Sequence, residues 1–438
     1  MNTNPESSPA MIRRVVFASV LGNAFEWFDF VIYGLFAATI AKLYFPASDP
    51  LASLSLTLAT FGVGFAVRPL GGVLLGMYGD RAGRRRALSV TIVLMAVGTG
   101  MIGLLPTYAA IGLGAPILIM VARMIQGISA GGEFSGATTM LIEFAPADRR
   151  GLFGSFQMCS QALSISCGAA IAWLLTSQLD TAQFESWGWR LPFLFGVLVG
   201  PVGWLIRSKI DESPEFVAFA RATGHGAQRT AKTTLRELFG NHARAMVAGI
   251  GICVVGTVSS YVFNFFIPIF AKQQLGIPAT EANLSTFLST AIVVALCPFT
   301  GHLSDKYGRK AVLLPGILGY GVTAWLLFHH FVAAPSFYSL LTMQVGVSFF
   351  MSLIWGPAPV ALTEIFPVGV RSTGAALAYN FSAMIFGGLA PFINTWLVKV
   401  TGSNLTPIYY VEFSVLIGIV GTCLLPGAAR LNIAARAV

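Results

Sequence analysis

The sequence predicts an all-α polytopic membrane protein with twelve transmembrane helices, arranged as two six-helix bundles. Of its 438 residues, 55% are hydrophobic and only 10% are charged, and the mean hydropathy is +0.74. A soluble protein of this length could not cover its surface with so few charges. The composition therefore excludes a cytosolic enzyme, a disordered regulator and a secreted disulfide scaffold. Since a spanning helix needs about 20 apolar residues, the chain has room for about twelve.

Apolar segments follow one another along the chain with short polar breaks. The first begins after Arg13 and Arg14 and is interrupted by Glu26 and Asp29, so it is too long and too polar for a cleaved signal peptide and is interpreted as a span. The predicted spans are 13–42, 51–79, 87–106, 112–143, 151–178, 189–208, 244–271, 282–304, 311–331, 336–364, 371–400 and 407–428.

The longest polar stretch, 208–241, separates the sixth span from the seventh. It predicts an N-terminal six-helix bundle, a cytoplasmic linker and a C-terminal six-helix bundle, at 1–208, 209–243 and 244–438. If the N-terminus is cytoplasmic, only four of the 27 Lys and Arg residues lie on the opposite loops. This asymmetry predicts that both termini are cytoplasmic.

The two halves repeat the same motifs. The stretch 76–85 follows the second span and the stretch 301–310 follows the eighth, and both read Gly-x-x-x-Asp-Arg/Lys-x-Gly-Arg-Arg/Lys. A Glu, a Pro and an Arg recur after the fourth and the tenth span, at 143–150 and 364–371. The corresponding motifs are separated by nearly the same number of residues, which indicates duplication of a six-span unit. In transporters built from such repeats, the substrate site lies at the interface of the repeats near the bilayer midplane.

The repeated loop resembles the signature of the major facilitator superfamily. The resemblance to this superfamily covers nearly the whole chain. Four stretches are similar to the metabolite:proton symporter family, namely 22–30, 68–72, 123–133 and 187–193. The second half looks most like the citrate and tricarballylate carriers of that family, at 361–364, 385–391 and 397–402. The resemblance implies a transporter of the bacterial inner membrane that imports an organic acid or a zwitterion together with protons.

Ionisable side chains inside a span are costly and indicate function. Glu26 and Asp29 share one stripe of the first span with Tyr33, and with Glu133 they are the candidates for proton coupling; the alternative is that they tie helices together. Arg123, with Gln126 one turn on, is a candidate ligand for an anion because a guanidinium matches a carboxylate bidentately. Arg68 is a candidate for substrate contact or for gating.

Neutral polar and aromatic side chains inside other spans suit a ligand with several oxygens, although such residues also hold helices together. We expect no ionisable residue deep in a span of the second half, so that charge and coupling belong to the first half and specificity to the second. The candidates for substrate contact, beyond Tyr33, Arg68, Arg123 and Gln126, are Gln157, Gln161, Tyr261, Asn264, Trp355, Tyr379 and Asn380.

Charged residues of the repeated loops are predicted to form a breakable latch on the cytoplasmic side, as the superfamily resemblance implies; the alternative is a purely topological role. The predicted gating residues are Asp80, Arg81, Arg84, Arg85, Glu143, Arg150, Asp305, Arg309, Glu364 and Arg371.

No cofactor and no metal are expected. The chain has no GxxxxGK[ST] motif, and its five cysteines lie in apolar runs without a CxxC pair. No nucleophile and base stand together on a loop, so we expect no enzyme. The net charge of +9 reflects topology and not nucleic-acid binding. The expected partners are an organic acid, protons and the lipid bilayer, and the expected functional unit is a monomer.

The leading hypothesis is proton-coupled import of an organic anion by alternating access, with citrate or a related tri- or dicarboxylate as substrate. 2-Oxoglutarate, shikimate-like acids and aromatic acids remain open, as does Na⁺ in place of H⁺. A symporter of zwitterionic osmolytes is the first alternative; similar osmosensing members carry a C-terminal coiled coil, and no heptads follow the last span here. A drug antiporter is less favoured because the fifth span lacks a Gly-Pro break.

Overall fold

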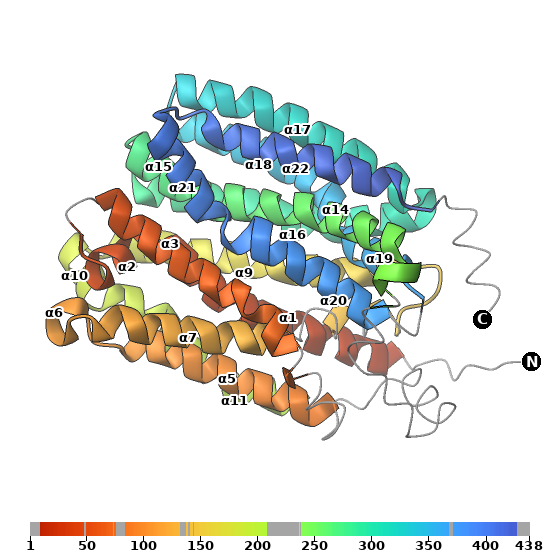
Figure 1. The fold of residues 1–438 in the computed structure, drawn as a ribbon, viewed down its shortest axis with the longest axis horizontal. Helices are drawn as coiled ribbons and strands as arrows, with labels where there is room; N and C mark the ends of the chain where they lie inside the picture. Colours follow the sequence, from red (N-terminus) through yellow and green to blue (C-terminus); the bar gives the residue numbers. More distant parts are fainter. Residues whose placement is uncertain are drawn as a thin grey trace, which may run out of the picture.

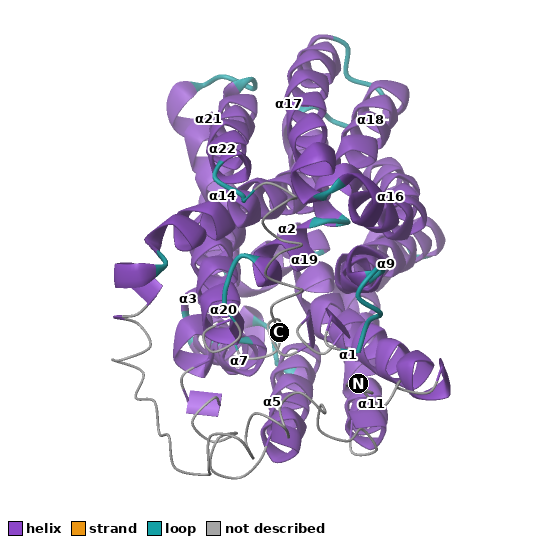
Figure 2. Cartoon of the chain, turned by 90° about the vertical axis from the view of Figure 1, so that its right-hand side faces the viewer, coloured by secondary structure: helices purple, strands orange, loops and turns teal. Residues whose placement is uncertain are grey.

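The computed structural model describes residues 9–47, 50–72, 74–75, 84–131, 137–138, 141–142, 144–207, 236, 238–367 and 371–426. Every regular element in this part of the chain is helical, and the long helices run side by side as one bundle (Figure 1). The view along the bundle in Figure 2 shows the helices of the two halves of the chain on opposite sides. The fold is that of a multi-spanning membrane protein.

The first half of the chain forms the helices drawn from red to yellow-green in Figure 1. They are α1 (Pro9–Leu35), α2 (Ala37–Tyr44), α3 (Pro50–Ala66), α5 (Arg84–Leu104), α6 (Tyr108–Ile111), α7 (Gly114–Ala130), α9 (Arg150–Gln178), α10 (Thr181–Ser186), η1 (Gly188–Arg190) and α11 (Leu191–Arg207).

The second half follows in green to blue. Its helices are α14 (Ala243–Ser260), η2 (Tyr261–Phe266), α15 (Ile267–Gln274), α16 (Ala279–Tyr307), α17 (Arg309–Ala333), α18 (Phe337–Trp355), α19 (Ala358–Glu364), α20 (Arg371–Ser382), η3 (Ala383–Gly388), α21 (Ala390–Thr401) and α22 (Thr406–Cys423).

In the part of the chain that the structure describes, each of the twelve predicted spans overlaps one helix or consecutive helices. Within the described residues, eight helices are long and apolar enough to cross a membrane, and a ninth is obtained if α1 and α2 form one bent span. The other three predicted spans coincide with α5, α7 and α11. The predicted linker lies mostly outside the described residues. α1 begins and α22 ends at the same end of the bundle, which we call the terminal end (Figure 1).

Two spans of the second half contain a π-helical turn that the sequence did not predict. η2 separates α14 from α15, and η3 separates α20 from α21. Each turn ends shortly before a proline, Pro268 or Pro391. A proline inside a helix has no N–H to donate and its ring clashes with the carbonyl of the residue four positions earlier. A π-turn relieves that clash by widening one turn.

The halves meet along several helix pairs. The most extensive pairing joins α9 of the first half to α16 of the second, and α3 packs on η3 and α21. Within the first half, α3 and α7 approach closely at glycines. A Cβ atom on Gly127 would overlap the carbonyl oxygen of Gly64 and lie 2.6 Å from Cγ2 of Val67.

Gly127→Ala is expected to destabilise the protein by about 1–3 kcal/mol, because the added methyl group meets backbone that cannot turn aside. The measurement is the thermal midpoint of the purified protein in detergent. Gly114→Ala is the matched control on the same helix, since its Cβ would find no atom closer than 3.6 Å. Equal midpoints for the two variants would show that α3 and α7 are not packed this closely.

Candidate functional site

Two buried arginines lie against the same aromatic ring, that of Phe30 in α1. Arg68, which follows α3, is 1% exposed, and Arg123 of α7 is fully buried. The guanidinium carbon of Arg68 lies 4.7 Å from the centre of the Phe30 ring, and that of Arg123 lies 4.5 Å from it. We call Arg68 and Arg123 the arginine pair.

Donors of the arginine pair remain available. The Nε and Nη2 atoms of both side chains have no hydrogen-bond acceptor among the described residues. Leaving charged donors buried without acceptors is costly. Such a site gains most from a ligand with negatively charged oxygens, above all a carboxylate that a guanidinium can bind with two parallel hydrogen bonds.

Aromatic rings surround the arginine pair from both halves of the chain. Besides Phe30, Arg68 faces the rings of Trp27 and Phe65, and Arg123 faces those of Tyr33 and Phe61. Contacts between a cation and ring faces stabilise a buried charge without occupying its hydrogen-bond donors. Tyr261 of η2 closes this cluster from the second half, with its ring 5.3 Å from that of Phe65 and 6.2 Å from that of Phe61.

A chain of hydrogen bonds connects Asp29 of α1 to Arg123. Asp29 accepts a hydrogen bond from the hydroxyl of Thr99 on α5. Nε2 of Gln126 donates to the Thr99 hydroxyl over 3.0 Å, and Nη1 of Arg123 donates to Oε1 of Gln126 over 2.7 Å. The Gln126 side chain therefore bonds to protein groups here, although sequence analysis assigned it to the substrate. Sequence analysis missed Thr99, whose only signal is a hydroxyl in an apolar span.

The two carboxylates of the first span point to different neighbours. Asp29 lies beside Thr99 and against Gly196 of α11, inside the first half. Glu26 is close enough to interact electrostatically with Tyr261 and Tyr379 of the second half, and also with Asp29. The two carboxylates predicted to share one stripe therefore remain coupled, while Glu26 alone of the two also acts on hydroxyls of the second half.

A small cavity lies at this interface. Its volume is about 40 Å³, which is room for water but far below the roughly 300–1,000 Å³ of a site that encloses an organic ligand. Four of the residues predicted to contact substrate line the cavity together, namely Gln161, Tyr261, Trp355 and Tyr379.

The other seven predicted substrate contacts do not line this cavity, namely Tyr33, Arg68, Arg123 and Gln126, described above, and Gln157, Asn264 and Asn380. Gln157 bonds to Asn23 of α1 over 2.8 Å. Asn380 donates to the carbonyl oxygen of Gly131 over 3.1 Å and so joins the second half to the first. Asn264 is buried in η2 and its Nδ2 has no acceptor among the described residues.

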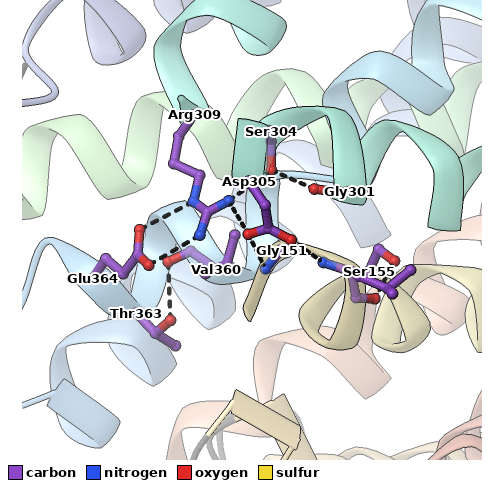
Figure 3. A network of polar contacts seen from close by, with 10 residues as sticks. Gly151, Ser155, Gly301, Ser304, Asp305, Arg309, Val360, Thr363 and Glu364 are labelled. Atoms are coloured by element: carbon purple, nitrogen blue, oxygen red, sulfur yellow. Dashed lines mark hydrogen bonds and ion pairs between the residues drawn. The ribbon is translucent and has the colours of Figure 1, made fainter. Parts of the chain in front are cut away.

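The second copy of the repeated loop forms a polar network at the terminal end (Figure 3). Asp305 of α16 accepts hydrogen bonds from the backbone N–H groups of Gly151 and Leu152, over 2.7 and 2.9 Å. These groups belong to the N-terminus of α9, where a carboxylate is favoured. Arg309 donates to Asp305 over 2.6 Å and to both oxygens of Glu364 over 3.1 Å. We call this the Asp305 network; it joins the two halves.

The remaining gating candidates contribute less here. Arg150 begins α9, and its Nε is buried without an acceptor among the described residues. Arg371 donates to the carbonyl oxygen of Phe366, within its own half. Some candidates lie outside the described residues, namely Asp80, Arg81, Glu133 and Glu143, and the side chains of Arg84 and Arg85 are not described either.

The expectation that no ionisable residue lies inside a second-half span is wrong. Glu412 lies within α22, where it approaches Gly321 of α17, and its Oε1 is buried without a hydrogen-bond partner among the described residues. The residue was visible in the predicted twelfth span. No group of three or more His, Cys, Asp and Glu side chains stands ready for a metal ion in the part of the chain that the structure describes.

A bundle of spanning helices with a buried polar centre between its halves defines a membrane transporter. Residues 15–232 match the family model "Sugar (and other) transporter", and residues 252–435 match "Major Facilitator Superfamily". The chain is 39% identical over 404 residues to a citrate-proton symporter of Klebsiella pneumoniae, covering 92% of this chain and 89% of that protein. The chain belongs to the major facilitator superfamily, which confirms the resemblance found in its sequence.

Other relatives and solved structures agree with this assignment. A proline/betaine transporter of Salmonella typhimurium is 32% identical over 416 residues, covering 93% of this chain and 82% of that protein. The crystal structure of a D-xylose-proton symporter superposes with a TM-score of 0.73 at 21% identity, covering 95% and 98% of the two chains. A xylose transporter of E. coli in a partially occluded, inward-open conformation also gives a TM-score of 0.73, at 18% identity over 94% and 97% of the chains.

Proposed function

We propose that this protein is a proton-coupled symporter that imports an organic anion, citrate or a related tri- or dicarboxylate. The observation that carries the proposal is the arginine pair, whose unpartnered donors at the centre of the bundle suit carboxylates. The resemblance to the citrate-proton symporter of Klebsiella pneumoniae supports the same substrate class. Zwitterions such as proline or betaine are the second candidate, since relatives named for them match over 93% of this chain.

Proton coupling follows from the energetics of an anion. Moving one negative charge inward against 100 mV costs about 2.3 kcal/mol, so a di- or trivalent acid accumulates only if compensating cations move with it; the proposed cations are protons. Asp29 and Glu26 are the proposed proton carriers, and Arg123 and Arg68 the proposed ligands of the anion. In this scheme the two halves alternate between an outward-open and an inward-open state and carry the anion across the membrane.

The orientation proposed for this transporter places the terminal end in the cytoplasm of a bacterial cell, with the protein in the inner membrane. The excess of Lys and Arg on that side supports it. The Asp305 network then closes the cytoplasmic side and breaks when the halves rock. The division into bundles at 1–208 and 244–438 with a linker between them, and function as a monomer, belong to the same proposal.

Uptake of radiolabelled citrate into proteoliposomes tests this function. A pH gradient and a potassium–valinomycin potential are imposed separately, and radiolabelled betaine is offered in parallel vesicles. We expect citrate to accumulate with an inward proton gradient and the accumulation to collapse with a protonophore. Accumulation of betaine but not of citrate would show that the transported substrate is a zwitterion and not an organic anion. Movement of neither, in correctly oriented and folded protein, would contradict symport of both classes.

A further inference from the structure

We propose that Thr99 of α5 is a positioning residue that reports the protonation of Asp29 to Arg123. The proposal rests on the proposed function, in which Asp29 carries a proton and Arg123 binds the anion. Thr99 is fully buried and lies between the two residues, with Gln126 as the last member of the connection. No substrate contact is needed for this role.

The orientation of Gln126 follows from chemistry. Arginine has only donors, so the amide oxygen of Gln126 must face Nη1 of Arg123. Its amide nitrogen, which can only donate, therefore faces the Thr99 hydroxyl. Thr99 must accept this hydrogen bond in every protonation state of Asp29.

The Thr99 hydroxyl has one proton and two possible acceptors for it. One is the Asp29 carboxylate, and the other is the carbonyl oxygen of Met95, 2.9 Å away on the same helix. When Asp29 is ionised, the proton points to Asp29. When Asp29 is protonated, its O–H donates to Thr99, and the hydroxyl proton turns to Met95. A hydroxyl oxygen has room for two incoming donors, so Gln126 stays bonded in both states.

The two states differ in how firmly Gln126 is held. A hydroxyl that donates to a carboxylate is a better acceptor, because hydrogen bonds in a chain polarise one another. A hydroxyl that already accepts a hydrogen bond from protonated Asp29 is a poorer acceptor for the amide of Gln126. Protonation of Asp29 therefore weakens the Gln126 bond to Thr99 and loosens the support of Nη1 of Arg123. Arg123 is then free to turn its donors toward an arriving anion, which orders proton binding before substrate binding.

Glycines leave room for this chain of side chains. A Cβ on Gly196 of α11 would lie 2.8 Å from Oδ1 of Asp29 and 2.9 Å from Cγ2 of Thr99. A Cβ on Gly98 would lie 2.6 Å from Cγ of Gln126. Both contacts are closer than ordinary packing allows, so the neighbouring helices accommodate the chain only because these positions have no side chain.

The test compares Thr99→Val, which keeps the shape and removes the hydroxyl, with Thr99→Ser, which keeps the hydroxyl. Two rates are measured in proteoliposomes: exchange of internal for external citrate at equal pH, and accumulation of citrate driven by a pH gradient. For Thr99→Val we expect accumulation to fall by about tenfold or more, as for loss of a hydrogen bond to a charged group, while exchange falls far less. Thr99→Ser is expected to restore accumulation.

Thr176→Val is the control, because among the described residues the Thr176 hydroxyl bonds only to carbonyls of its own helix. Gly196→Ala is a second variant, expected to show the same loss of accumulation relative to exchange if Thr99→Val does not fold. Equal losses of the exchange rate and the accumulation rate, or accumulation by Thr99→Val at the wild-type level, would overturn the role proposed for Thr99. The proposed function of the protein would not be affected by that result. Wild-type vesicles that neither exchange nor accumulate citrate would overturn the proposed function and this inference together.

Discussion

Arg123→Ala is expected to abolish binding and uptake of citrate. Truncating one partner of a buried, hydrogen-bonded charge pair costs about 2–5 kcal/mol, which is a loss of affinity of about 30-fold or more. Arg123→Lys keeps the charge but lacks the planar fork, so it should recover only part of the loss. The measurements are equilibrium binding of radiolabelled citrate to the purified protein and its initial uptake rate in proteoliposomes.

Arg149→Ala is the matched control for the loss of a positive charge. The side chain of Arg149 is 60% exposed, and its carboxylate partner Asp148 is also exposed. We therefore expect Arg149→Ala to leave the binding of citrate unchanged. Thermal midpoints in detergent must show that all variants fold. Wild-type affinity in folded Arg123→Ala would show that the arginine does not bind the substrate and would leave Arg68 as the anion ligand.

Asp305→Asn is expected to slow transport by about tenfold or more while changing the apparent affinity for substrate much less. The carboxylate accepts from two backbone N–H groups of α9 and from Arg309, and each hydrogen bond to a charged group contributes about 1.5–3 kcal/mol. An amide cannot accept at its nitrogen and lacks the charge favoured at a helix N-terminus. The state closed at the terminal end is then less populated, and the cycle slows.

Initial rates over a range of citrate concentrations separate the maximal rate from the KM in that experiment. Asp148→Asn is the control, because Asp148 is 78% exposed and pairs only with Arg149 among the described residues. A normal maximal rate with a raised KM would be the opposite pattern, and it would assign Asp305 to the substrate site and not to a gate.

The course of the spans and the residues of the Asp305 network were predictable because both leave strong local signals. Long apolar runs and a repeated charged loop need no knowledge of tertiary contacts. Asp305, Arg309 and Glu364 were selected by their repeat and by the superfamily resemblance, and the structure places them in one network. The superfamily resemblance implied that such an aspartate meets an arginine and a neighbouring helix end. That the helix end would be that of α9 was not predictable, since every helix N-terminus offers backbone amides.

The inner site was predicted in composition and not in arrangement. Arg68 and Arg123 were found because a charge inside a span is rare, but nothing in the sequence indicated that both would lie against the ring of Phe30. Helical periodicity put Glu26 and Asp29 on one stripe. Their different neighbours depend on which helices stand around α1, which periodicity does not contain. Thr99 was missed for the same reason, since a hydroxyl in a span has no meaning until its partner is known.

The π-turn η2 has a consequence for any experiment that follows side chains along its span. All six residues from Tyr261 to Phe266 are buried, whereas a regular helix in a membrane alternates between protein and lipid on each turn. A π-turn takes in one residue more than an α-turn, so the side chains beyond it are rotated by about 100° relative to an uninterrupted helix. A helical wheel drawn through the whole span would therefore assign the side chains of α15 to the wrong neighbours.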